Sequence, residues 1–532
     1  MLVGALGLLG CSNKPPAQPL ASATTVTPAP PSGSKDVPSI GAGPATAPVK
    51  DVPSIGAGPA TAPTPTPIPL KLLKIEPVKG YVGDPFTVTA EGLSPGRDVE
   101  LVWVTVDGGY VTKASAENVE FYEKQFTEKR VSLGRARVDA TGKLTVPFKA
   151  PEDYGEVHDI YAVVDGQDVA RGGYRIQRQA TITPEAGPLG TPITIKITGL
   201  GWKTYESTVA LRYDNQWAGI ISAVTTRGTA TAVIRATGRT GKHVIDLNHG
   251  GRSMPFLNNA QSGTAHIPDL QAWFTVTDDK TMPPFALDWP DSTRLAQSSG
   301  AAPRTTAVAS AAAIAAPSLA ASVDPASGPI LSRPTLRLRG LAPSAEVEAF
   351  WVTARGNRVS LSGWSLSETS ILKTVTDRDG SLSATIQVPD DLGGWHVVKV
   401  VQGGKVVVEV PYFVERSVVG VTPLRVKAGE TFKVQIKGIG WTELDNGVAI
   451  TYDNSYIGFA CGFNSNGDVT VNLVATGGPG IHLIDLYPMI YQGHGKPPWS
   501  YQVPLLSFRD DAPGLALGYK LPAIRLAVEI VE

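Results

Sequence analysis

The sequence twice places a histidine three residues before an aspartate inside an apolar run, a spacing that suggests a catalytic pair. The two pairs are His243 with Asp246 and His482 with Asp485. A histidine and a carboxylate that met could carry out general acid–base catalysis. The flanking residues predict β-strands, however, and successive side chains on a strand point to opposite faces. We therefore expect no dyad at either place unless a β-bulge intervenes.

Two further histidines occupy the same position in related segments, a few residues after a glycine and at the entry of an apolar strand. His158 lies in GEVHDIYAVV and His396 in GGWHVVKVV, to be compared with GKHVIDL and GIHLIDL above. Recurrence of the same residue in four modules favours a structural role over a role in a single active site. We expect structural histidines, with the ring packed at the end of a β-sandwich and one ring nitrogen bonded to a loop carbonyl.

The tripeptide YDN occurs twice, at 213–215 and 452–454, each time shortly before an aromatic residue. Asp-Asn after an apolar strand predicts a hairpin turn with the tyrosine packed beneath it. The alternative is a sugar-binding patch, in which an aromatic ring stacks on a pyranose while the carboxylate and amide bond its hydroxyl groups. The residues of this patch would be Asp214, Asn215 and Trp217 in the first copy and Asp453, Asn454 and Tyr456 in the second. Calcium would need several spaced oxygens, which this turn does not offer.

An aromatic loop, LYPMIYQGHGKPPWSYQ, follows the second HLIDL segment and contributes Tyr487, Tyr491 and Trp499. Loops that join late strands gather at one end of a β-sandwich, where such folds usually bind. This loop is therefore our best single candidate for a ligand surface. The alternative is an ordered loop that only covers the end of the sandwich.

Motifs of catalysis and cofactor binding do not occur: there is no zinc spacing, nucleophile elbow, P-loop or dinucleotide fingerprint. We expect no catalytic residue, no metal and no cofactor. The net charge of −1 argues against a nucleic-acid partner. An envelope hydrolase that uses Asp and His near the sandwich ends is the remaining enzymatic alternative.

Internal repeats define the elements that position these residues. GLGWKTYESTVALRYDN from Gly199 matches GIGWTELDNGVAITYDN from Gly438, and GLSPGRDVELVWVT from Gly92 matches GLAPSAEVEAFWVT from Gly340. The chain therefore contains a duplicated pair of modules, A1–B1 and A2–B2. Each has about 100 residues of short segments with alternating apolar residues, as in TPITIKITGL. This pattern predicts an all-β protein of four tandem immunoglobulin-like β-sandwich domains.

The opening of three modules carries a shared pattern, IEPVKGYVGDPFTV from Ile75, ITPEAGPLGTPITI from Ile182 and VTPLRVKAGETFKV from Val421. It resembles the IPT/TIG type of immunoglobulin-like domain. The resemblance covers most of the part expected to fold and implies binding and spacing modules of surface proteins. Its motifs describe a strand and a turn rather than a site.

The N-terminus, MLVGALGLLGCSN, joins a short apolar run to Cys11. LLGC resembles the lipobox of bacterial lipoproteins, which implies lipid modification of Cys11. A signal normally begins with Lys or Arg, and none precedes Cys11, so the true start codon could lie upstream. Lipidation would leave Cys461 without a partner, and we expect a buried thiol there. The segment behind Cys11 repeats KDVPSIGAGPATAP and is rich in Pro, Ala and Thr, which predicts a disordered, extended stalk.

The predicted organisation is a signal peptide and lipobox (1–11), a stalk (12–70), domain A1 (71–178), domain B1 (179–277), a flexible low-complexity linker (278–320), domain A2 (321–415), domain B2 (416–510) and a C-terminal tail (511–532). The tail is expected to add a strand to the last domain or to dock on it. Residues 113–133 are a charged insertion in A1, expected as a short helix or a hairpin extension. We predict a non-catalytic surface lipoprotein with an adhesive or envelope-scaffolding role, lipid-anchored outside the cytoplasm. Its expected partners are the membrane, through Cys11, and cell-wall polysaccharide or surface proteins. A carbohydrate-binding module that uses the aromatic residues of the B domains is the alternative.

Overall fold

The computed structural model describes residues 70–114, 119–203, 206–251, 254–261, 267–290, 319–357, 363–462, 465–491, 502–516 and 520–532. These residues belong to one compact unit, Pro67–Glu532. The expected signal peptide with Cys11, nearly all of the expected stalk, most of the expected linker and Trp499 lie outside the described residues.

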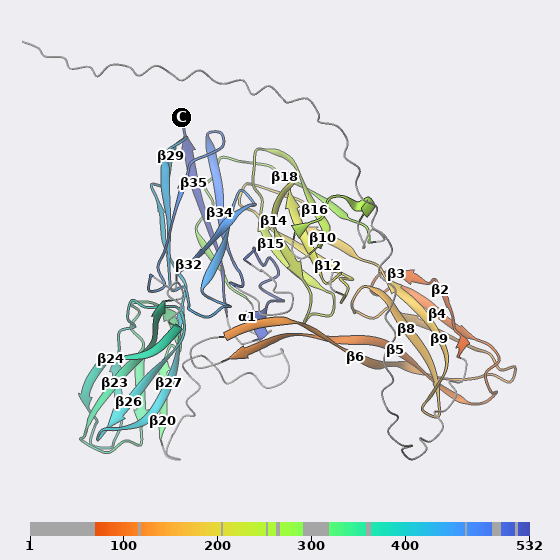
Figure 1. Cartoon of the computed structure of the whole chain (residues 1–532), viewed down its shortest axis with the longest axis horizontal. Helices are drawn as coiled ribbons and strands as arrows, with labels where there is room; N and C mark the ends of the chain where they lie inside the picture. The colour runs from red at the N-terminus through yellow and green to blue at the C-terminus, as the bar shows by residue number, and fades with distance from the viewer. Residues whose placement is uncertain are drawn as a thin grey trace, which may run out of the picture. The chain divides into compact units, whose positions relative to one another are not determined.

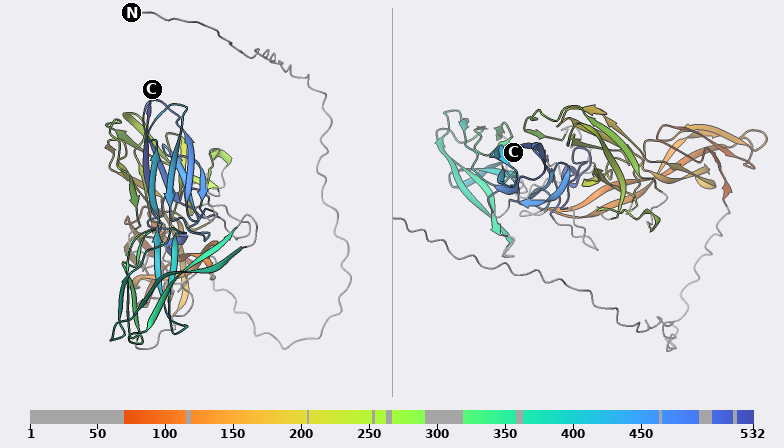
Figure 2. Two further views of the ribbon diagram at one scale, coloured as in Figure 1. Left: turned by 90° about the vertical axis from the view of Figure 1, so that its left-hand side faces the viewer. Right: turned by 90° about the horizontal axis from the view of Figure 1, so that it is seen from above.

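Four immunoglobulin-like β-sandwiches follow one another along the described chain, which confirms the predicted fold class. Each sandwich pairs a three-stranded sheet with a sheet of five or six strands. They are drawn as separate groups of arrows in Figures 1 and 2, orange for A1, yellow-green for B1, green to cyan for A2 and blue for B2. No helix among the described residues has the length and apolar character that a membrane crossing needs.

Domain A1 combines the sheet β2-β4-β7 with the sheet β1-β9-β8-β5-β6, in which β3 also pairs β9. Its strands are β1 (Lys71–Leu72), β2 (Lys74–Glu76), β3 (Lys79–Gly80), β4 (Pro85–Ala90), β5 (Asp98–Ala114), β6 (Val119–Arg137), β7 (Leu144–Lys149), β8 (Glu156–Val164) and β9 (Gln167–Ile176). The expected insertion at 113–133 lies in the long hairpin of β5 and β6, which are paired antiparallel from Asp98 with Arg137 to Ala114 with Val119.

Domain B1 combines β10-β12-β15 with β11-β18-β16-β13-β14, and β17 pairs β16. Its strands are β10 (Gln179–Thr183), β11 (Ala186–Gly187), β12 (Pro192–Thr198), β13 (Thr208–Tyr213), β14 (Gln216–Ser222), β15 (Ala230–Arg235), β16 (Gly241–Gly251), β17 (Met254–Pro255) and β18 (Leu270–Val276), with a short 3-10 turn at Asn259–Gln261. Apolar residues alternate along β12, which explains why one face of this strand lies on the core. Ile193, Ile195 and Ile197 are each 0% exposed and face the core.

Domain A2 repeats A1 with the sheets β20-β22-β25 and β21-β27-β26-β23-β24. Its strands are β20 (Ala320–Asp324), β21 (Ser327–Pro329), β22 (Thr335–Arg339), β23 (Glu346–Asn357), β24 (Gly363–Val375), β25 (Leu382–Thr385), β26 (Gly394–Gln402) and β27 (Lys405–Glu415). Trp351 and Tyr412 are buried in its core, as Trp103 and Tyr174 are in A1.

Domain B2 combines β28-β30-β33 with β19-β35-β34-β31-β32, and β29 also pairs β35. Its strands are β19 (Ala286–Asp288), β28 (Ser417–Thr422), β29 (Arg425–Lys427), β30 (Thr431–Lys437), β31 (Gly447–Tyr452), β32 (Ser455–Cys461), β33 (Val469–Val474), β34 (Gly480–Pro488) and β35 (Ala523–Val531), with helix α1 at Pro513–Ala516. Two of these strands come from outside the segment 416–510. β19 belongs to the expected linker, and β35 belongs to the expected tail and lies inside the sheet.

The two A–B junctions are built alike. The backbone N–H of Gly155 donates to Leu200 O at 2.9 Å, and that of Gly393 donates to Ile439 O at 3.0 Å. Buried Arg178 and Arg416 immediately precede β10 and β28, the first strands of the two B segments, and each donates to a carbonyl oxygen of the B domain that follows it. Burial lowers the pKa of both guanidinium groups to about 10.

B1 and B2 also share a core. Tyr487, Leu506, Phe508 and Ala523, which follow or belong to strands of B2, pack with the buried residues of B1. Residue Leu505 pairs with Ile220 on the edge strand β14, so the segment after β34 continues the B1 sheet. The B domains are therefore joined by apolar contact and by backbone hydrogen bonds, although they are separated in the sequence by the whole of A2.

Candidate functional site

The histidines of the two A domains are buried at the sandwich ends. His158 stacks on Trp103 with 4.4 Å between ring centroids, and His396 stacks on Trp351 at 4.6 Å. The Nε2 atom of each ring lies 2.7–2.8 Å from the carbonyl oxygen four residues earlier, and Nδ1 lies 2.8–3.0 Å from the carbonyl of the residue after the tryptophan. Burial lowers the pKa of His396, against the opposing effects of Asp391 and the two carbonyls.

The histidines of the two B domains have one carboxylate partner each. Nδ1 of His243 lies 2.6 Å from Asp214, and Nδ1 of His482 lies 2.5 Å from Asp453. Nε2 again faces the carbonyl four residues earlier, at 2.7 and 2.9 Å. Burial acts to lower the pKa of His482, but the hydrogen bond and charge of Asp453 outweigh it and the pKa is raised. Both nitrogens of each ring are occupied, so neither ring can pass a proton to a substrate in this geometry.

The aspartates three residues after these histidines have other partners. Asp246 pairs with Arg212 at 3.3 Å, and Asp485 pairs with Arg235 at 2.7 Å. The histidine and the aspartate of each pair therefore do not meet. This agrees with the expectation that residues three apart on a strand project from opposite faces. Among the described residues, no group of three or more His, Cys, Asp and Glu side chains could hold a metal ion.

The two YDN segments form two-residue hairpin turns. Asp214 and Asn215 have φ of 49° and 67°, Asp453 and Asn454 have φ of 49° and 61°, and the flanking residues are paired. These values belong to type I′ turns, which Asp and Asn favour. Tyr213 is buried beneath the first turn and donates to the carbonyl of the B1 residue Thr237 at 2.9 Å.

The aromatic residues of the expected sugar patches contact each other. Trp217 of B1 and Tyr456 of B2 lie edge to face, with 5.5 Å between centroids. The indole N–H of Trp217 donates to Gly219 O at 3.0 Å, and the hydroxyl of Tyr456 donates to Gln502 O. These rings are therefore used in the contact between B1 and B2, together with Asn454, whose amide donates to Arg235 O at 2.8 Å.

The aromatic loop after β34 is less accessible than its sequence indicates. Tyr487 is 1% exposed and its hydroxyl accepts from Arg525 at 2.7 Å, which corrects the expectation of a surface ring. Tyr491 is half-buried and its backbone N–H donates to Glu443 O. Cys461, expected to be buried, is half-buried at the end of β32.

A buried charge network crosses the same contact and was not predicted from the sequence. Arg235 of B1 and Asp485 of B2 have side chains that are 5% and 2% exposed. Arg525 on β35 bonds Tyr487 at 2.7 Å, Asp288 at 3.0 Å and the backbone of Val233 in B1 at 2.9 Å. The sequence signal was weak, because Arg525 lies in the segment interpreted as a tail.

An aromatic cleft lies where the outer face of A2 meets the end of the β19–β35 pair of B2. Its A2 side comes from three neighbouring strands, because Phe413 on β27 is paired with Ser327 on β21 and with Trp395 on β26. Directly paired residues project from the same face of a sheet. The alternate residues Tyr412 and Val414 face the core, so this row projects outward.

The B2 side of the cleft comes from the strands β19 and β35. Trp289 follows Asp288, the last residue of β19, and Lys520 precedes β35. Together with Glu415 at the end of β27, these residues line a hollow of about 380 Å³. The rings of Trp395 and Phe413 lie edge to face, with 5.3 Å between centroids. We define the aromatic cleft by Ser327, Phe413, Trp395, Glu415, Trp289 and Lys520.

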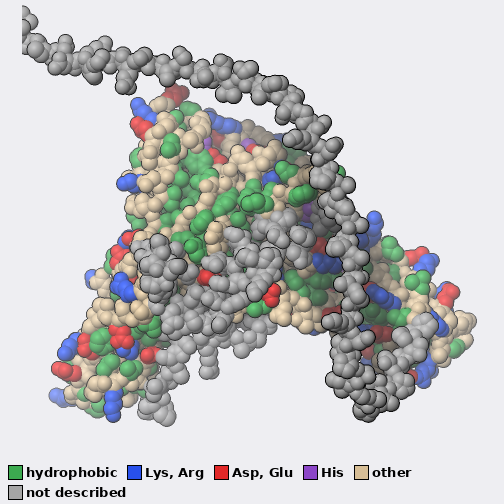
Figure 3. All heavy atoms as spheres, viewed as in Figure 1, with side chains coloured by type: hydrophobic (Ala, Val, Ile, Leu, Met, Phe, Trp, Pro, Cys, Tyr) green, Lys and Arg blue, Asp and Glu red, His purple; other side chains and the backbone are tan. Residues whose placement is uncertain are grey.

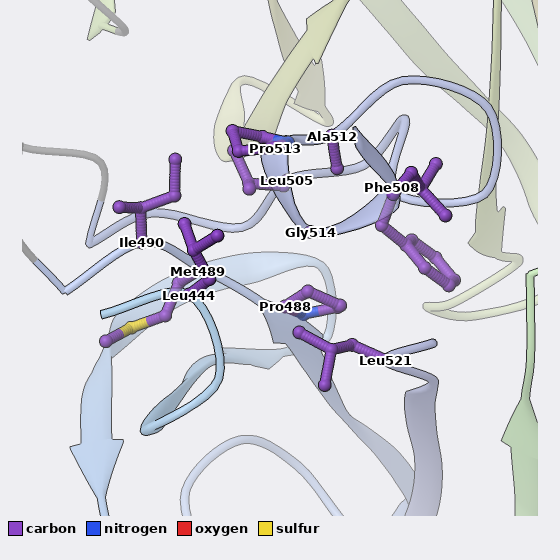
Figure 4. A pocket seen from close by; sticks show the side chains of 11 residues that line it. Leu444, Pro488, Met489, Ile490, Leu505, Phe508, Ala512, Pro513, Gly514 and Leu521 are labelled. Carbon is purple, nitrogen blue, oxygen red and sulfur yellow. The ribbon is translucent and has the colours of Figure 1, made fainter. Parts of the chain in front are cut away.

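Two other hollows are less suited to a ligand. The first, in Figure 4, is lined by Met489, Phe508, Leu521 and other apolar side chains of B2, and its volume of about 20 Å³ suits no more than a water molecule. The second, of about 120 Å³, lies around Arg239, Asp279 and the His482–Asp453 pair. On the face shown in Figure 3, acidic and basic side chains of A1 and A2 are interspersed.

No family model matches the chain, and no curated protein matches it. Among solved structures, it is similar to an ICAM-5 D1–D4 ectodomain fragment at 12% identity, over 86% of this chain and 99% of that chain, with a TM-score of 0.17. A protein of Corynebacterium diphtheriae, described as membrane-anchored, is 11% identical over 87% and 91% of the two chains, with a TM-score of 0.17.

An α-2-macroglobulin of Salmonella is 9% identical over 77% of this chain, with a TM-score of 0.16, and the chain spans 28% of that protein. Likenesses at these values carry no argument about activity or partners. The fold class rests on the sheet order of the four sandwiches.

Proposed function

We propose that this protein is a non-catalytic binding and scaffolding module, anchored by lipid at Cys11 and displayed outside the cytoplasm. The observation that supports the role is the joining of B1 and B2 through a shared apolar core and the buried Arg235–Asp485 pair. Such a joint holds binding surfaces on separate sandwiches at one spacing, which suits an adhesive or envelope-binding scaffold. The partners proposed are the membrane, and cell-wall polysaccharide or surface proteins.

The anchor is tested by changing its cysteine. The wild-type chain should incorporate a radiolabelled fatty acid and sediment with membranes, and Cys11→Ala should do neither. Cys461→Ala is the matched control, because it removes the one other cysteine of the chain and should behave as wild type. A wild-type chain that takes no label would refute the lipid anchor.

The binding role is tested with the purified full chain on intact cells and on isolated cell-wall sacculi. Saturable retention on either surface would support the proposal, and no retention on both would refute it. A hydrolase is the less favoured reading, since both nitrogens of His243 and His482 are already bonded. The alternative of sugar binding through Trp217, Tyr456 and Tyr487 meets a similar objection, because these three side chains are committed to contacts inside the molecule.

A further inference from the structure

We propose that the aromatic cleft between A2 and B2 is a saccharide-binding site that takes one or two sugar rings. This inference deepens the binding role proposed above and rests on it, since it names the class of ligand. It uses none of the residues that the sequence suggested for sugar binding.

The rings of the cleft supply the stacking surface. Trp395 and Trp289 are half-buried, so part of each indole remains exposed. Phe413 is 9% exposed and supports Trp395 from the side. The C–H face of a pyranose is apolar and carries a slight positive charge, and it therefore packs well on the electron-rich face of an indole.

The polar groups of the cleft supply directional bonds. Ser327 Oγ donates to Glu415 Oε1 at 2.6 Å, which holds the carboxylate in one orientation. Four other polar groups of the cleft make no hydrogen bond within the part of the chain that the structure describes. They are Glu415 Oε2, the Lys520 ammonium and the indole N–H groups of Trp289 and Trp395. Half-buried groups of this kind gain from a ligand that can both donate and accept, and sugar hydroxyls do both.

The size and charge of the cleft narrow the choice of ligand. Ligand sites commonly measure roughly 300–1,000 Å³, so a hollow of about 380 Å³ suits a small ligand or the end of a chain. Aromatic rings with a carboxylate also suit a quaternary ammonium group. Lys520 opposes that choice, because it places a positive charge at the same cleft.

The test is a titration of the purified full chain, kept in a detergent without a sugar headgroup. The probes are glucose, N-acetylglucosamine, cellobiose, chitobiose and choline chloride, followed by calorimetry and by tryptophan fluorescence. At least one saccharide should bind saturably. Trp395→Ala and Trp289→Ala should each weaken its binding by about tenfold or more, and Glu415→Gln should weaken it less.

Trp273→Ala is the matched control, because Trp273 is 53% exposed on B1 and lies outside the cleft, and it should bind as wild type. Circular dichroism and thermal unfolding verify that each variant is folded, and Glu415→Gln keeps the test open if a tryptophan variant unfolds. The inference is overturned if no saccharide binds, if the folded cleft variants bind as wild type, or if only choline binds.

The two proposals fail separately. Retention of the chain on sacculi or cells without binding of any saccharide would leave the proposed scaffold role standing and remove the saccharide site. Saccharide binding without retention on any surface would support the saccharide site and refute the proposed scaffold role.

Discussion

Four histidines occupy equivalent corners of the four sandwiches, but their partners divide them into two chemical types. In the A domains the ring lies between two carbonyl oxygens, as His396 shows. In the B domains a carboxylate replaces one carbonyl, as at His482. Burial without a charged partner favours the neutral ring, and a carboxylate favours the imidazolium. Histidines at equivalent positions, His396 and His482, thus have pKa values shifted in opposite directions.

The first prediction concerns the titration of these rings. NMR titration should find the pKa of His396 below the ordinary value of about 6.5 and the pKa of His482 above it. The contribution of His482 to stability is therefore present below pH 6.5 and lost as pH rises through its higher folded pKa. That of His396 is present above pH 6.5 and lost as pH falls through its lower folded pKa.

Asp453→Asn is the control for this prediction, since it removes the charge that raises the pKa of His482 and leaves His396 untouched. The pKa of His482 should fall in this variant. Equal pKa values for the two rings in the wild type would contradict the assignment.

At the scale of elements, the sequence predicted the strands and hairpin turns, because these depend on the local pattern of residues. The alternation of Ile193, Ile195 and Ile197 and the Asp-Asn turns led directly to strands and hairpins. The tail adds a strand to the last domain, as one of the two expectations for it had it, but its place between β34 and β19 did not follow, because a strand pattern does not name its neighbours. The aromatic cleft was missed for the same reason. Trp395 stands beside the buried His396 and must therefore face outward, but Trp289 comes from a segment interpreted as a linker.

The second prediction concerns the A–B junctions. A Cβ atom at Gly155 would lie 1.9 Å from Gly199 O, and one at Gly393 would lie 1.8 Å from Gly438 O. Gly155→Ala should therefore force the backbones apart and lower the free energy of unfolding by about 1–3 kcal/mol, measured by thermal or urea unfolding. Gly109→Ala on β5 is the control, because its added methyl meets nothing within 4 Å. Unchanged stability of Gly155→Ala would show that the junction is looser than described.

At the scale of the whole molecule, B1 and B2 are neighbours because of side chains that the sequence separates widely. Arg235 and Asp485 form an ion pair whose two side chains are almost fully buried, and Asn454 and Tyr456 add contacts from the second YDN hairpin. Because the two domains derive from one duplicated unit, the same turn serves two purposes. In B1 it is the end of a hairpin, and in B2 it also contacts the other copy.

The third prediction tests this contact. Arg235→Ala should leave Asp485 with a buried charge and one fewer partner, and it should lower the free energy of unfolding by about 3–5 kcal/mol. Scanning calorimetry should then separate the melting of B1 from that of B2. Arg337→Ala, at an exposed residue of A2 whose side chain is 56% exposed, is the control and should change little. A single unchanged transition in Arg235→Ala would contradict the shared joint.

The fourth prediction concerns the end of the chain. Removal of residues 523–532 deletes β35, including Ile524, Leu526 and Val528, which are each 0% exposed. B2 should then lose its fold, seen as rapid proteolysis of the segment after residue 416 while A1 remains protected. Removal of Glu532 alone is the control and should have no effect. A truncated chain in which B2 stays protected would show that β35 is dispensable.

The place of β35 also has a consequence for the order of events during synthesis. β19 and β35 are partners, so B2 needs residues that emerge before A2 and residues that emerge after the rest of B2. A1 can fold as soon as its own strands have been synthesised, whereas the sheet of B2 stays incomplete until β35 has been synthesised. A chain interrupted before β35 would expose that sheet to proteases. The sheet of B2 can therefore close only after translation has passed Val531.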